Sequence, residues 1–74
     1  MNVAAVRTRY EHINHGWRRA SAERRAALIG ELELLSLQLP AVTPDDRERE
    51  KIIGLRADIL ELVNQITVGL ADAD

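Results

Sequence analysis

The chain has 74 residues, with ten basic and twelve acidic side chains and a formal net charge of −2 at pH 7. This length predicts a single small domain over residues 1–74, and such a domain buries only about 60% of the surface of its unfolded chain. Small domains compensate with disulfides, metals, oligomerisation or very regular helix packing. Cysteine is absent, which excludes disulfides and thiolate metal sites. Two histidines offer little for a structural metal, so oligomerisation and regular helix packing remain.

The first predicted helix covers about residues 2–16. Its apolar residues recur every three or four positions, the spacing of one helix face. They are Val3, Val6, Tyr10, Ile13 and Trp17. Gly16 favours a helix end or a kink, and Ser21 can cap the next helix. The pattern leaves open whether the first two helices are continuous through a bend.

The second predicted helix covers about residues 21–39 and has two apolar stripes. The first stripe consists of Leu28, Leu32, Leu35 and Leu39. The second consists of Ala27, Gly30, Leu34, Leu37 and Ala41. A helix that is apolar on two sides has to be covered on both, so we expect it to lie between the other two helices.

The third predicted helix covers about residues 44–71. Pro40 cannot continue the preceding helix, Thr43 can cap a new one, and Pro44 suits its first position. The apolar stripe of this helix consists of Ile52, Leu55, Ile59, Leu62 and Ile66. At 1.5 Å per residue the helix is roughly 40 Å long, against about 28 Å for the second.

These elements predict an all-α fold, in which the second and third helices form a long antiparallel hairpin and the first packs across it. We expect the C-terminal part of the third helix to overhang the second, and a second copy to cover the overhang in a homodimer. The first helix is the alternative cover. The alternation of Ile and Leu resembles that of two-stranded coiled coils. The predicted self-association residues are Ile59, Leu62, Val63, Ile66 and Leu70.

The stretch YEHINHGWRR, residues 10–19, contains both histidines of the chain together with its only Tyr and Trp. His12 and His15 share a helix face. Catalytic zinc, however, usually takes three protein ligands, two of them from a His-Glu-x-x-His helix. Here the spacing is one residue short and no third histidine exists. We therefore predict no metal site and no cofactor.

Catalytic patterns are also missing from the sequence. Ser21 and Ser36 occupy a capping position and a helix interior, and neither lies in a Gly-x-Ser-x-Gly turn. There is no Gly-rich phosphate loop. The acidic stretch DDRERE alternates in sign, as solvated helix faces do. We predict that the protein is not an enzyme.

The same stretch provides the best candidate for a contact with another protein. Trp, Tyr and Arg are enriched among the residues that dominate binding energy at interfaces. Trp17 closes the first apolar stripe, so core packing and partner contact are both open to it. The predicted partner-binding residues are Tyr10, His12, Trp17, Arg18 and Arg19.

Nucleic acid is the alternative partner. Residues 1–25 carry six arginines and two glutamates, a balance of +4, whereas residues 26–74 have a balance of −6. Arginine suits phosphate contacts, and the first two helices could form a helix-turn-helix pair. The second helix nevertheless carries Glu31 and Glu33 and lacks the polar face of a recognition helix.

The predicted function is therefore that of a small cytoplasmic protein-interaction module, with a DNA-binding transcriptional regulator as the alternative. The order of elements is similar to that of small helical secretion chaperones of flagellar and type III systems, in which a Gly-Trp pair before the second helix is common. An adaptor or an inhibitor would have the same pattern. We expect no membrane segment, and the excess of Arg over Lys suggests a bacterial or phage origin.

Overall fold

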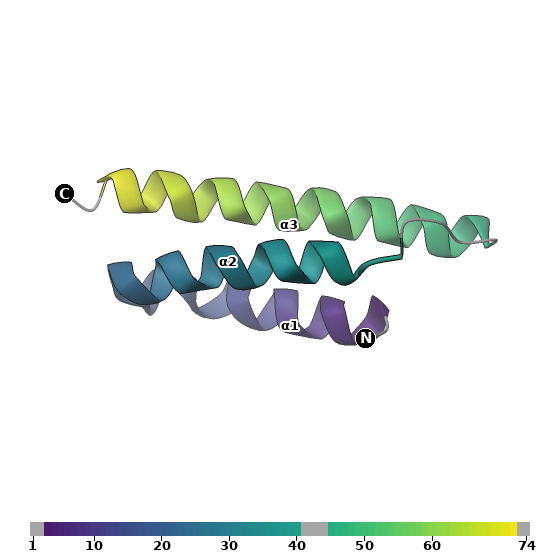
Figure 1. Ribbon diagram of the computed structural model, residues 1–74, viewed down its shortest axis with the longest axis horizontal. Helices are drawn as coiled ribbons and strands as arrows, with labels where there is room; N and C mark the ends of the chain where they lie inside the picture. Colours follow the sequence, from purple (N-terminus) through teal and green to yellow (C-terminus); the bar gives the residue numbers. More distant parts are fainter. Residues whose placement is uncertain (1–2, 41–44, 73–74) are drawn as a thin grey trace.

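The computed structural model describes residues 3–40 and 45–72, with side chains described as far as Leu70. They form α1 (Val3–Gly16), the short 3-10 helix η1 (Trp17–Arg19), α2 (Ala22–Gln38) and α3 (Asp46–Asp72). The predicted all-helical fold with three helices is confirmed, as is the packing of α2 against α3. The molecule is elongated, about 46 Å long and 17 Å wide. Figure 1 shows the C-terminal part of α3 beside the start of α2.

The break between α1 and α2 follows from local chemistry. The α-helix ends at Gly16, and η1 carries the chain to Ala20, whose backbone is extended. Ser21 then caps α2, because its hydroxyl accepts a hydrogen bond from the backbone N–H of Arg24 at 3.1 Å. The predicted cap is confirmed, and the first two helices are separate.

The start of α3 lies two residues later than predicted. Asp45 precedes the helix, and its carboxylate accepts a hydrogen bond from the backbone N–H of Arg47 at 2.9 Å. The first turn also carries Asp46 and Glu48, which the positive end of the helix dipole stabilises. The predicted roles of Thr43 and Pro44 lie outside the described residues.

The core contains one apolar stripe from each helix, and all three stripes are the ones that the spacing predicts. Within the described residues it consists of Val6, Ile13, Trp17, Leu28, Leu32, Leu35, Leu39, Ile52, Leu55, Ile59, Leu62 and Ile66. Val3 and Tyr10, the other members of the first stripe, pack against this core but are only half-buried. Regular spacing on three helices therefore builds one continuous core.

The expected cover over the second stripe of α2 is wrong for a single chain. Ala27 and Gly30 are exposed, Leu34 is 60% exposed and Leu37 is 80% exposed; Ala41 lies outside the described residues. The reason is the position of α1, which contacts both α2 and α3 and covers only one side of this pair.

The expected overhang is also at the wrong end. Ile66 is fully buried within the single chain, and Ile59 and Leu62 are buried as well. The turns of α3 that extend past α2 are its first ones (Figure 1), and residues 46–51 are exposed. Because α3 begins beyond the end of α2, its C-terminal part lies beside η1.

The difference between the two stripes of α2 can be measured. Leu32→Ala removes a fully buried side chain and should lower the free energy of unfolding by about 2–5 kcal/mol. Leu37→Ala removes an exposed one and should change it by no more than about 0.5 kcal/mol. Urea unfolding followed by far-UV circular dichroism provides both values. Equal losses would contradict this arrangement of the helices.

Candidate functional site around Trp17

Trp17 lies where the chain turns from α1 into α2, and its indole packs on α3. A Cβ atom added to Gly69 would lie 3.2 Å from Cζ3 of the indole, closer than ordinary van der Waals contact. Glycine therefore lets the helix backbone approach the ring. Trp17 is only 7% exposed, so its core role is confirmed.

Two arginines stack on the indole. The guanidinium carbons of Arg18 and Arg25 lie 4.8 Å and 5.4 Å from the ring centroid, within the range of cation–π attraction. Arg25 also donates hydrogen bonds to the carbonyl oxygens of Trp17 at 3.2 Å and of Arg18 at 2.7 Å. These bonds hold η1 against the first turns of α2.

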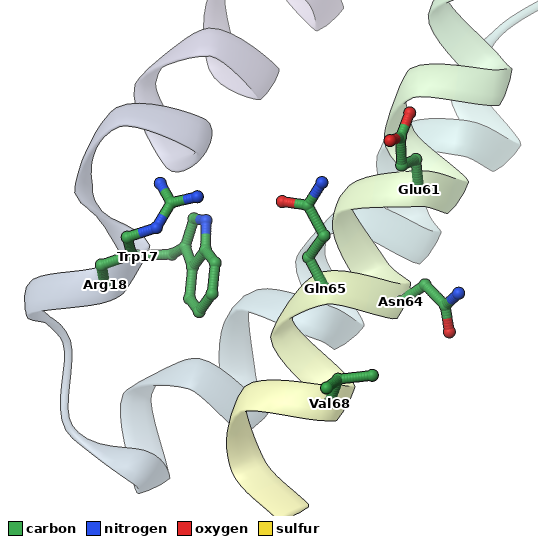
Figure 2. Close-up of a pocket in the computed structure, with 6 residues that line it drawn as sticks. All are labelled: Trp17, Arg18, Glu61, Asn64, Gln65 and Val68. Atoms are coloured by element: carbon green, nitrogen blue, oxygen red, sulfur yellow. The ribbon is translucent and has the colours of Figure 1, made fainter. Parts of the chain in front are cut away.

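The indole N–H is the unusual feature of this site. Nε1 of Trp17 is buried and has no hydrogen-bond partner. A buried donor without an acceptor is rare, and it loses about 1–3 kcal/mol relative to one that is paired. Figure 2 shows the guanidinium of Arg18, itself a donor, beside this nitrogen, and the side chain of Gln65 directed toward the indole.

An open hollow of about 450 Å³ adjoins the indole on the α3 side. Its lining combines the aromatic ring, a cation, two side-chain amides, a carboxylate and an exposed valine. The residues are Trp17, Arg18, Glu61, Asn64, Gln65 and Val68. Gln65 points toward the indole, whereas Glu61, Asn64 and Val68 point away from it along the outer surface of α3 (Figure 2). We call this region the Trp17 hollow.

The structure divides the predicted partner-binding residues between two sides of the indole. Trp17 and Arg18 line the Trp17 hollow. His12 lines a smaller hollow of about 130 Å³ between α1 and α2. Tyr10 is half-buried, and burial together with the negative charges of Asp58 and Glu61 raises its pKa.

Arg19, the last predicted partner residue, is exposed and lines neither hollow. The residues of α3 that complete the Trp17 hollow were not predicted from the sequence. Their positions on α3 give no local signal, because only the packing of α3 against η1 brings them beside the indole.

The predicted self-association residues lie mostly in the core of the single chain. Ile59, Leu62 and Ile66 are buried, and Val63 and Leu70 are half-buried. In this fold the buried ones are not available to a second copy. Self-association itself stays a prediction, and any surface for it has to lie elsewhere.

The remaining chemistry of the described residues is limited. No group of three or more His, Asp or Glu side chains there is placed to hold a metal ion. None of the described helices has the length and hydrophobicity that a bilayer crossing requires. Comparisons with protein-family models, curated proteins and solved structures found no match for the chain.

An ion pair joins α1 to α2 beside the smaller hollow. Nε of Arg9 donates a hydrogen bond to the carboxylate of Glu31. This bond, together with the charges of Arg9 and Arg24, lowers the pKa of Glu31. Both side chains of the pair are about one third exposed, so solvent screening limits its contribution.

The pair predicts a pH dependence. Because the folded-state pKa of Glu31 is lowered, its contribution is present above the unfolded-state pKa and is lost as the pH falls through the folded-state value. Glu31→Gln should lower the free energy of unfolding by about 0.2–1 kcal/mol at neutral pH, and the difference should vanish in acid. Urea unfolding of both proteins across this range measures it. A difference that grows in acid would contradict the pairing.

Proposed function

We propose that the protein binds another protein through the Trp17 hollow and performs no catalysis. The observation that carries this proposal is the buried indole N–H without an acceptor. A partner that places an acceptor oxygen beside Nε1 would remove this loss. The antiparallel hairpin of α2 and α3 would act as the rigid support of the hollow, with the cytoplasm as its compartment.

The chemistry of the hollow favours an acidic group of the partner. The guanidinium of Arg18 lies over the indole, next to Nε1 in Figure 2. A carboxylate that accepts from Nε1 would at the same time meet the positive charge of Arg18, and charge-assisted bonds are about twice as strong as neutral ones. Arg18 is exposed, so its side chain can move aside to admit the ligand.

The rim of the hollow adds apolar area and further polar contacts. Val68 is 55% exposed, and the amides of Asn64 and Gln65 can donate or accept hydrogen bonds. Interfaces commonly combine an aromatic or arginine anchor with a polar rim. An adaptor, an inhibitor and a chaperone are all consistent with such a site.

The test compares two charge reversals in affinity capture with quantitative mass spectrometry. Arg18→Glu should abolish recovery of the partner, because the new carboxylate repels the acidic group. Lys51→Glu makes the same charge change near the start of α3, where it is exposed, and should leave recovery unchanged. Each purified variant is first checked for an unchanged helix content.

A reconstituted complex provides the second readout. Trp17 is the only tryptophan, so its fluorescence emission reports directly on the hollow. We expect the emission to shift on addition of the captured partner to the wild type and to stay constant with Arg18→Glu. A partner that is lost equally with Lys51→Glu, or that leaves the emission unchanged, would contradict the proposal.

The structure gives less support to nucleic acid as the partner. Two of the six arginines in the first third bind within the chain, Arg9 to Glu31 and Arg25 to backbone carbonyls. The exposed surface of α2 includes Glu33, Leu34 and Leu37, which do not offer the donors that read base edges.

Binding of DNA should accordingly be weak and dependent on salt. We expect dissociation constants of about 10⁻⁴–10⁻⁶ M at physiological ionic strength, as for non-specific binding. Fluorescence anisotropy with labelled duplexes over a series of salt concentrations measures both affinity and salt slope. Sub-micromolar binding to one defined sequence would instead support the regulator.

A further inference from the structure

The outer surface of α3 carries an exposed seam that is apolar at its first three members and polar at its last two. Its members are spaced four, three, four and three residues apart, the a/d spacing of a coiled coil. They are Ile53, Ala57, Leu60, Asn64 and Thr67. All five are exposed, Ile53 to 58% and Leu60 to 59%. We call this set the outer seam.

Leu60 faces away from α1, whereas Asn64 of the same seam lines the Trp17 hollow. The charges of Asp58 and Glu61 act on Tyr10, so α1 lies toward that side of α3. Successive residues of a helix are about 100° apart, which places Leu60 about 200° around the helix from Asp58. No described helix covers this side of the α2–α3 pair.

We propose that a second copy of this chain covers the outer seam, with the two α3 helices parallel about a two-fold axis. The charges beside the seam support this occupant. The a positions of the outer seam are Ala57 and Asn64. In a parallel coiled coil, the residue just before an a position lies opposite the residue five places further along the other chain. Arg56 then faces Glu61 of the second copy, and Val63 faces Val68. An antiparallel pair brings like flanks together and loses both matches.

One further observation fits a second copy. Asn64 occupies an a position, where a single asparagine sets register and favours a defined oligomer.

The proposed interface shares Glu61, Asn64 and Val68 with the rim of the Trp17 hollow, so a second copy and the partner would compete for that part of α3. Leu60 does not line the hollow, and Leu60→Asp leaves both Trp17 and Arg18 unchanged. Loss of the dimer and loss of partner capture are therefore read separately. The residues first predicted for self-association are mostly buried, whereas those of the outer seam are exposed on the same helix.

Sedimentation equilibrium with two matched variants tests the surface. We expect a dimer for the wild type at about 100 µM, a concentration at which a micromolar Kd gives an almost fully dimeric sample. Leu60→Asp should give a monomer of unchanged helicity. Leu34→Asp makes the same change at an equally exposed leucine of α2 and should leave the dimer intact. A monomeric wild type, or a dimer that survives Leu60→Asp, would overturn the proposal.

Cysteine cross-linking tests the direction, since the wild type has no cysteine. Ile53→Cys and Thr67→Cys lie on the outer seam seven residues before and after Leu60. In the parallel dimer each variant should form a disulfide with its own copy, because bridging requires Cα atoms within about 7 Å. Leu34→Cys is the control and should not link. A disulfide only in the mixture of Ile53→Cys with Thr67→Cys would show antiparallel helices and overturn the parallel arrangement.

Charge reversal supplies a test of the flanking pair. Arg56→Glu and Glu61→Arg should each weaken the dimer by about tenfold, because repulsion replaces attraction at two symmetric sites. An equimolar mixture of the two variants should form heterodimers, since opposite charges then face each other again. Two variants that associate as well as the wild type would show that Arg56 and Glu61 do not face each other across the interface.

Discussion

The contact between Trp17 and Gly69 is the interaction on which the rest of the structure depends. The ring lies so close to α3 that even a Cβ atom at position 69 would crowd it. The contact joins the turn between α1 and α2 to the C-terminal part of α3, far away in the sequence. With the indole in place, Ile66 is buried within one chain. The same contact leaves the hollow beside the ring.

Arginine has several structural roles around this contact. Arg25 stacks on the indole and bonds two carbonyl oxygens of η1, and Arg9 pairs with Glu31 across α1 and α2. A long apolar stem with a planar, permanently charged head allows packing and hydrogen bonding at once. The basic first third of the sequence is thus partly a structural feature. Charge clustering alone was a weak indication of a nucleic-acid partner for this reason.

The small core explains why apolar surface is left over. Each helix contributes one buried stripe, and a domain of this size has no further layer to cover a second one. The second stripe of α2 and the outer seam of α3 therefore stay exposed in the single chain, where Leu37 is 80% and Leu60 59% exposed. Contiguous apolar surface of this kind is characteristic of proteins that associate with others. The Trp17 hollow differs from both stripes because it also contains a donor and a cation.

The sequence by itself determined the helices and the residues that form the core. Apolar residues that recur with the 3.6-residue period of an α-helix mark its buried face before any packing is known. For this reason the leucines at 28, 32, 35 and 39 and the isoleucines at 52, 59 and 66 were identified correctly. The cap at Ser21 followed from its own side chain. Such features depend on neighbours within about one helical turn.

Only the tertiary structure decided how the helices are offset and what lies beside Trp17. Spacing specifies which face of a helix is buried, but it contains no information on how far one helix slides along another. The overhang was therefore expected at Ile66, whereas it occurs at the first turns of α3 (Figure 1). The offset also brings Gln65 and Gly69 to the indole. Trp17 and Gly69, more than fifty positions apart in the sequence, meet because α3 begins beyond the end of α2, and no local pattern reports that offset.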